Sequence, residues 1–108
     1  MSTISLTIHK TNTETILKFS SETILTSGSY QFNNIDEAKE SPLAQQLFHL
    51  PFIKRVFISA NFIALEKFSI IEWADVQNEV KEQIENYLNS GNELILKNEA
   101  PKKTPIEI

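Results

Sequence analysis

The feature that most constrains the fold is a pair of extended runs, Ile53 to Ser59 and Phe62 to Lys67, separated only by Ala60 and Asn61. Asparagine tolerates the left-handed backbone conformation that tight hairpins need. We therefore expect an antiparallel hairpin here, with Asn61 supplying the turn. One side of this hairpin is aliphatic, and we expect helices to cover it.

Three more strands are predicted before the hairpin. Ile4 to His9 alternates apolar and polar residues, Thr15 to Phe19 has Leu17 and Phe19 on one side, and Gly28 to Phe32 has Tyr30 and Phe32 on one side. A period of two is typical of a strand with one buried face.

The segment between the third strand and the hairpin is predicted to be helical. Asn34 and Glu37 have the spacing of a capping box, so a helix should begin at about Ile35. Proline disfavours helical geometry in the residue that precedes it. The Ser41-Pro42 pair therefore predicts either a kink or two short helices.

The longest helix is predicted after the hairpin. Ser69 and Glu72 again have capping-box spacing, and Gly91 supplies a typical helix end. Between them, one apolar stripe recurs at helical spacing: Trp73, Val76, Val80, Ile84, Tyr87 and Leu88. We expect Trp73 to anchor the core rather than to act as a stacking platform.

The order strand-strand-strand-helix-strand-strand-helix predicts an α+β fold of two layers, a mainly antiparallel sheet with helices packed on one face. A chain of 108 residues is expected to form one domain, which we place at residues 1–91. Residues 92–108 contain Pro101 and Pro105 and end on an alternating triplet. We expect a linker or the start of a further domain there, in a piece of a longer protein.

Composition excludes several classes of function. The 10 basic and 14 acidic residues give a net charge of −4, which argues against nucleic-acid binding. Two glycines leave no phosphate-binding loop, and the absence of cysteine removes disulfides, thiol nucleophiles and thiolate-held clusters. Membrane contact is not expected, since no apolar run is long enough to span a bilayer. The first residues lack a signal-peptide pattern, so a cytoplasmic location is expected.

No catalytic or metal-binding constellation can be assembled from the sequence. The two histidines, His9 and His49, have no suitably spaced partner ligands, and the acidic residues fit solvated helix faces. No serine lies in a nucleophile motif. We therefore expect no catalytic residue, no metal ligand and no cofactor bound by this chain, which points to a binding or accessory module and not to an enzyme.

The side of the hairpin opposite the expected helices carries two phenylalanines among charged residues. Ala64 and Glu66 share this side. The candidate partner-binding residues on it are Phe57, Phe62, Ile16, Lys18 and Arg55. An exposed apolar patch rimmed by charge often marks a partner surface. Alternatively, a loop or the tail from Leu94 to Leu96 covers these side chains.

One set of residues resembles a known family. The set consists of Ser41-Pro42-Leu43-Ala44, Leu47-Phe48, Pro51, Val56-Phe57, Phe62-Ile63, Lys67, Trp73, Val80, Ile84 and Ser90-Gly91. In this order and spacing they resemble the N-terminal domain of Nfu/NifU-type iron–sulfur scaffold proteins. The resemblance covers most of residues 1–91. One departure is that many members carry T-P-N-P where this chain reads Thr11-Asn12-Thr13-Glu14, so we expect a more flexible loop.

The resemblance implies a compact α+β fold and a part in iron–sulfur cluster assembly or delivery, with iron binding as a property of the family. In that family a separate C-terminal domain holds the cluster through a C-x-x-C pair. Because this chain has no cysteine, the iron–sulfur cluster is expected on a separate cysteine-bearing domain.

Two hypotheses of function follow. In the first, the chain is an accessory domain that does not ligate the cluster and contacts iron–sulfur assembly proteins or client apo-proteins. In the second, it is a purely structural spacer that raises solubility and has no direct partner contacts.

Overall fold

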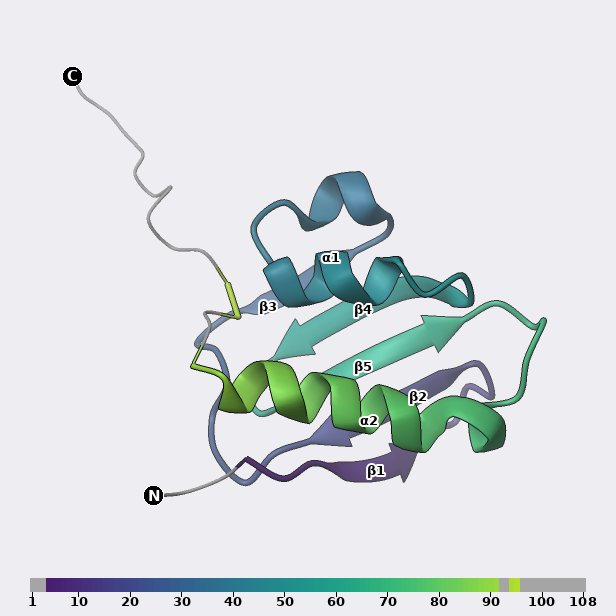
Figure 1. The fold of residues 1–108 in the computed structure, drawn as a ribbon, viewed down its shortest axis with the longest axis horizontal. Helices are drawn as coiled ribbons and strands as arrows, with labels where there is room; N and C mark the ends of the chain where they lie inside the picture. Colours follow the sequence, from purple (N-terminus) through teal and green to yellow (C-terminus); the bar gives the residue numbers. More distant parts are fainter. Residues whose placement is uncertain (1–3, 92–93, 96–108) are drawn as a thin grey trace.

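The computed structural model describes residues 4–91 and 94–95 of the chain. Five antiparallel strands form one sheet in the order β1-β2-β5-β4-β3 (Figure 1). The strands are β1 (Thr7–Lys10), β2 (Ile16–Ser20), β3 (Ser29–Phe32), β4 (Ile53–Ser59) and β5 (Phe62–Lys67). The helices are a short 3₁₀ helix η1 (Ile35–Ala38), α1 (Pro42–Phe48) and α2 (Trp73–Asn89). This confirms the predicted α+β class and the predicted order of elements.

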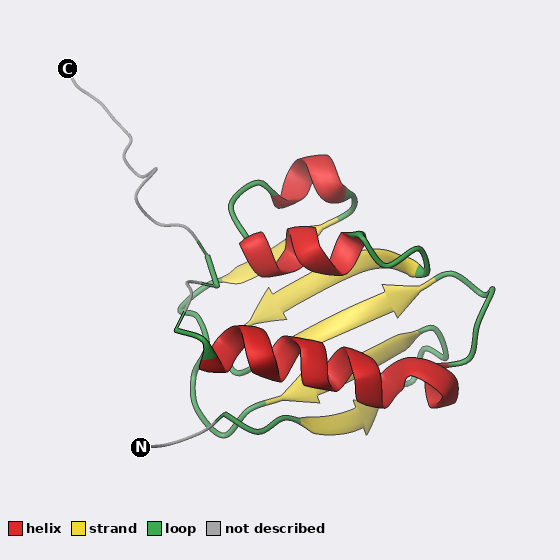
Figure 2. Cartoon of the chain, viewed as in Figure 1, coloured by secondary structure: helices red, strands yellow, loops and turns green. Residues whose placement is uncertain are grey.

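The two α-helices lie side by side on the same face of the sheet (Figure 2). The core fills the space between the helices and the sheet. Fully buried side chains come from the central strands and from both helices: Phe19, Val56, Ile58, Ile63, Leu65, Leu43, Leu47 and Ile84. Burial of each large aliphatic or aromatic side chain contributes about 1.5–3 kcal/mol to folding, so this layer supplies most of the hydrophobic stabilisation.

The hairpin forms with the predicted strand bounds, but its turn differs from the prediction. Ala60 has the positive φ, at 48°, and among the described residues Asn61 does not. The side chain of Asn61 is used elsewhere, since its amide donates to the carbonyl oxygen of Ser21 at 2.8 Å. The carbonyl oxygen of Ala60 accepts from the backbone of Leu25 and Thr26. The loop before β3 thus holds the turn, and Ala60 takes the strained position.

The first helical segment divides into two short helices, as one of the two alternatives predicted. Asn34 caps η1, because its side chain accepts from the Glu37 amide at 3.0 Å. Ser41 caps α1 in the same way, and Pro42 occupies the first helical position, where its missing N–H costs nothing.

The long helix begins at Trp73, as predicted, but the capping box does not form. Glu72 is the N-cap residue, and its side chain makes no capping hydrogen bond. Trp73 is buried between the rings of Phe19 and Phe52, with edge-on contacts at centroid distances of 6.3 and 6.4 Å. Its predicted role as a core anchor is confirmed. None of the described helices is both long and apolar enough to cross a membrane.

Candidate functional site

The face of the sheet opposite the helices carries all five candidate residues. We call this surface the open face and define it by Ile16, Lys18, Gln31, Arg55, Phe57, Phe62, Ala64 and Glu66. Register explains the grouping, because Ala64 on β5 pairs with Lys18 on β2 and with Phe57 on β4. The five candidate side chains are each half-buried. The structure therefore brings together the residues that alternation selected.

The centre of the open face is a shallow groove of about 560 Å³. Ile16, Phe57, Phe62 and Ala64 supply its apolar wall, and the polar strand β3 supplies Ser29 and Gln31. Ala64 is only 7% exposed, although no described helix covers it. The larger side chains beside Ala64 therefore screen it from solvent. Because the methyl group of Ala64 is small, it forms the floor of the groove.

A cation borders the groove on the β2 side. The Nζ atom of Lys18 lies 4.5 Å from the centroid of the Phe62 ring. A cation over an aromatic face at this distance is attracted to the ring, which contributes about 0.5–1 kcal/mol when both groups are partly exposed. The contact holds Phe62 and Lys18 together at one wall of the groove.

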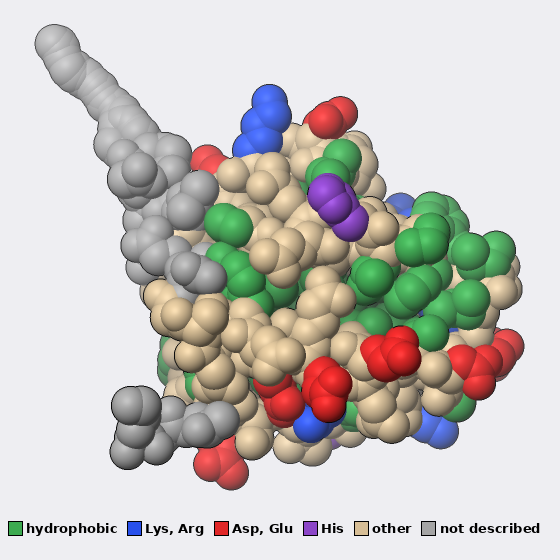
Figure 3. All heavy atoms as spheres, viewed as in Figure 1, with side chains coloured by type: hydrophobic (Ala, Val, Ile, Leu, Met, Phe, Trp, Pro, Cys, Tyr) green, Lys and Arg blue, Asp and Glu red, His purple; other side chains and the backbone are tan. Residues whose placement is uncertain are grey.

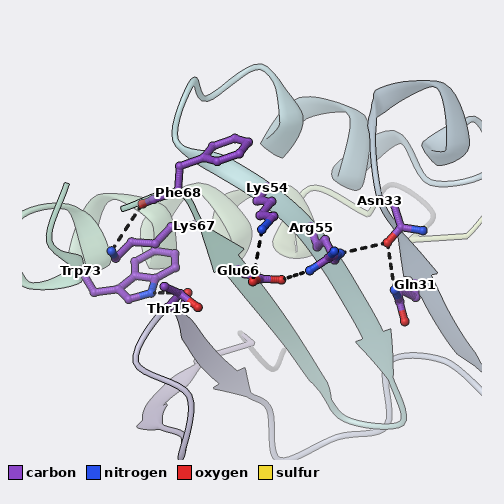
Figure 4. Close-up of polar contacts among 9 residues, drawn as sticks. All are labelled: Thr15, Gln31, Asn33, Lys54, Arg55, Glu66, Lys67, Phe68 and Trp73. Carbon is purple, nitrogen blue, oxygen red and sulfur yellow. Dashed lines mark hydrogen bonds and ion pairs between the residues drawn. The ribbon is translucent and has the colours of Figure 1, made fainter. Parts of the chain in front are cut away.

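A network of polar side chains borders the groove on the other side (Figure 4). A β-bulge sets Lys54 and Arg55 of β4 opposite the single residue Glu66 of β5, and both cations contact its carboxylate. Arg55 Nε also donates to the Asn33 side chain at 3.2 Å, which accepts from Gln31 at 2.9 Å. The network spans three strands and fixes the direction of the Arg55 side chain.

The tail does not cover the open face with the residues that the structure describes. Leu94 and Ile95 are buried in the same hydrophobic cluster as Leu47 and Ile84, on the helix side. Leu96, the third residue of the proposed cover, lies outside the described residues. For Leu94 and Ile95, the alternative in which the tail covers the phenylalanines is therefore wrong.

In the described part of the chain, no three His, Asp or Glu side chains are grouped so that they could hold a metal ion. His9 lies on β1 at the edge of the open face, with its Nε2 atom 2.8 Å from the Ser20 hydroxyl. Glu85 on α2 is held by the Leu6 amide at 2.7 Å and by Lys81 at 2.9 Å. The Leu6 hydrogen bond and Lys81 lower the pKa of Glu85, against an opposing effect of burial.

Sequence reasoning missed the contribution of β3 to this site. Gln31 and Asn33 join the site because β3 pairs with β4 and sets Gln31 opposite Phe57. The sequence does show Gln31 on the polar side of its strand, but the pairing depends on contacts distant in the chain. Alternation does place Glu66 on this side of the hairpin, but Glu66 is not among the candidate partner-binding residues.

The family assignment follows from a match that covers most of the folded chain. Residues 6–91 match the family described as "Scaffold protein Nfu/NifU N terminal". The chain belongs to this family. The predicted resemblance is thereby confirmed.

Relatives and solved structures agree with this assignment. The chain is 36% identical over 80 residues to the "NFU1 iron-sulfur cluster scaffold homolog, mitochondrial" of Drosophila sechellia, covering 74% of this chain and 28% of that protein. It is 25% identical over 89 residues to "NifU-like protein 4, mitochondrial" of Arabidopsis thaliana, covering 82% of this chain and 31% of that protein. The chain thus spans less than a third of the length of either relative.

Among solved structures, the NifU-like protein of Saccharomyces cerevisiae superimposes with a TM-score of 0.73 at 25% identity, over 89% of this chain and 87% of that one. Protein SAV1430 of Staphylococcus aureus has a TM-score of 0.61 at 19% identity, over 75% of this chain and 99% of that one. The second likeness concerns the fold alone.

The expected cytoplasmic location is wrong. The relatives in Drosophila sechellia and Arabidopsis thaliana are mitochondrial proteins by name, which contradicts a cytoplasmic location. The prediction failed because the absence of a signal peptide for secretion carries no information about other compartments.

Proposed function

We propose that this chain is an accessory domain of an iron–sulfur scaffold protein, and that it acts in cluster assembly or delivery by binding another protein on its open face. The observation that carries the proposal is the groove between Phe57, Phe62 and Ile16, which lies on a sheet face that no described helix covers. Half-buried aromatic residues around a groove are typical anchors of protein interfaces.

The chemistry of the chain supports a role without cluster ligation. Iron–sulfur clusters are held by cysteine thiolates, and this sequence contains none. A cluster would therefore be held by a separate cysteine-bearing domain. This chain would contribute affinity for an assembly protein or a client apo-protein.

The distribution of charge on the surface supports a partner that is acidic. Lys18, Lys54 and Arg55 lie beside the groove, and Lys54 and Arg55 contact the carboxylate of Glu66, whereas the whole chain has a net charge of −4. Acidic side chains gather over α2 on the helix side (Figure 3). An acidic partner would be attracted to the open face and repelled by the helix side. We infer a partner segment with apolar side chains for the groove and carboxylates at its edges.

The test measures binding of the purified chain to an iron–sulfur client in its apo form, purified from the same organism, by isothermal titration calorimetry. Phe57→Ala and Phe62→Ala are each expected to weaken binding by about tenfold or more, because both remove an aromatic anchor. Phe68→Ala is the matched control, since Phe68 is 45% exposed and lies outside the groove. Circular dichroism melts establish that each variant folds.

Equal affinity of wild type and both groove variants would refute the proposed surface. The spacer hypothesis makes a different prediction for the whole scaffold protein. Deletion of residues 1–91 would then leave the rate of cluster transfer to the client unchanged, whereas our proposal expects a slower transfer.

A further inference from the structure

Lys67 is buried without the partner that a buried charge usually has. It is 7% exposed and lies on the helix side of β5 with Ile63 and Leu65. In the described part of the chain, its Nζ atom makes one polar contact, a long hydrogen bond of 3.4 Å to the Phe68 carbonyl oxygen, and no ion pair. An ammonium group has three N–H donors, so at least two are left without a protein acceptor. A buried charge in this state is costly unless water or a ligand supplies the missing acceptors.

The ammonium-bearing side chain borders a cavity of about 460 Å³ at one end of the sheet. Figure 4 shows Lys67 and Trp73 together with Thr15 at this end. The remaining walls are the loop between β1 and β2, the first two residues of β2 and the start of α2. The loop is tied in place by the Thr11 hydroxyl, which lies 2.9 Å from the carbonyl oxygens of Thr13 and Ile16.

The first turn of α2 adds a second favourable feature for an anion. The side chain of the N-cap residue Glu72 makes no capping hydrogen bond, and within the described residues the amides of Trp73 and Ala74 have no hydrogen-bond partner. Both residues line the cavity. The N-terminus of a 17-residue helix carries a partial positive charge and free N–H groups, which favour a bound anion.

We propose that this cavity binds a carboxylate group, with Lys67 as its counter-ion. The lining of the cavity also includes three exposed charged residues, Lys10, Glu14 and Glu72. Two carboxylates in the lining disfavour a dianionic phosphate more strongly than a singly charged carboxylate. The apolar wall of Ile16, Leu17 and Trp73 suits the hydrocarbon part of such a ligand. The carboxylate belongs either to a small organic acid or to the C-terminus of a peptide.

Trp73 allows a direct measurement, because it is the single tryptophan of the chain and lines the cavity. Its fluorescence is followed during titration with three probes at constant ionic strength: succinate, N-acetyl-Ala-Leu with a free carboxylate, and the amide of the same dipeptide. A saturable change with succinate alone identifies the ligand as a small organic acid. A saturable change with the dipeptide acid alone identifies it as a peptide C-terminus. A saturable change with both probes shows that the site accepts a carboxylate from either source. No saturable change, or equal binding of the dipeptide amide, would overturn the proposal.

Lys67→Met tests the counter-ion, since methionine keeps most of the aliphatic stem and removes the buried charge. We expect the Kd of the bound carboxylate to rise by about tenfold or more, because a charge-assisted hydrogen bond is lost. Lys39→Met, at an exposed lysine far from the cavity lining, should leave the Kd unchanged. An unchanged Kd in Lys67→Met would refute the assignment. Should that variant fail to fold, the comparison of dipeptide acid and amide on the wild-type chain still decides the proposal.

This site shares Ile16 with the groove of the open face but none of the phenylalanines of that groove. Phe57→Ala is expected to bind the carboxylate probe as the wild type does, because Phe57 does not line this cavity. The two proposals can therefore fail separately.

Discussion

The indole Nε1 atom of Trp73 donates a hydrogen bond of 3.0 Å to the backbone carbonyl oxygen of Thr15. The same oxygen accepts the backbone N–H of Lys67, also at 3.0 Å. Thr15 immediately precedes β2 and Trp73 begins α2, so this single acceptor joins the start of the long helix to the sheet. The position of α2 over the core depends on this bond as well as on apolar packing.

Trp73→Phe removes the indole donor and retains an aromatic ring. We expect a fall of about 2 kcal/mol in the free energy of unfolding, of which about 1 kcal/mol comes from the hydrogen bond and the rest from lost ring volume. Urea denaturation followed by far-UV circular dichroism measures it, since the variant has no tryptophan to report. Stability equal to that of the wild type would show that the Thr15 carbonyl does not need this donor.

Ala60→Gly is expected to stabilise the protein. Ala60 has a φ of 48°, a left-handed conformation that costs an L-residue roughly 1 kcal/mol and glycine almost nothing. Part of this gain is offset by the greater entropy of glycine in the unfolded chain, so we expect a net gain of up to about 1 kcal/mol in thermal or urea unfolding.

The matched control for Ala60→Gly is Ala74→Gly. Ala74 is exposed in α2, where glycine lowers helix stability. The two identical substitutions should therefore change the free energy of unfolding in opposite directions. A loss of stability in both would mean that the turn conformation at Ala60 is not strained.

Glu85→Gln is expected to make the stability of the protein depend less on pH. The Leu6 hydrogen bond and Lys81 lower the pKa of Glu85 in the folded state from its ordinary value of 4.5. A carboxyl group with a lowered folded pKa stabilises the protein above its unfolded pKa, and this stabilisation is lost as the pH falls through the folded pKa. Wild type should therefore be more stable than the variant near pH 7.

Urea denaturation at several pH values, from about 7 down to about 3, measures this difference. The gap in unfolding free energy between wild type and Glu85→Gln should narrow below about pH 4.5. A gap that stays constant over this range would contradict the assigned cause. Glu79→Gln, at an exposed residue of the same helix, should show no such gap.

The sequence predicts much of this fold because its local patterns agree with one another. Alternation in the hairpin, the stripe of α2 and Pro42 at the start of α1 each depend on neighbours within a few residues. The five candidate residues of the open face follow from the same alternation. Lys67 could also have been found, since alternation places it with Ile63 and Leu65 on the buried side of β5.

The features that escaped prediction depend on contacts between distant segments. The bulge at Lys54 turns Ile53 toward the core, where strict alternation would set it on the open face. Asn61 was expected to supply the left-handed turn, but it binds Ser21, 40 residues away. Ser69 and Glu72 have the spacing of a capping box, yet Glu72, and not Ser69, is the N-cap residue of α2, and its side chain makes no capping hydrogen bond.

Glu66→Gln tests whether charge on the open face guides a partner. Glu66 is the carboxylate that Lys54 and Arg55 share, so its loss adds positive charge beside the groove. The rate of association with the apo-client that has acidic flanks should therefore rise. The rise should be larger at about 0.01 M than at about 0.15 M ionic strength, because the Debye length is about 30 Å at the lower and about 8 Å at the higher ionic strength. Stopped-flow fluorescence with a labelled client measures the rate.

Glu82→Gln is the matched control. It makes the same change of charge on the helix side, at an exposed residue of α2, and should raise the association rate less. Equal effects of the two substitutions would mean that net charge alone, and not the open face, sets the rate of association.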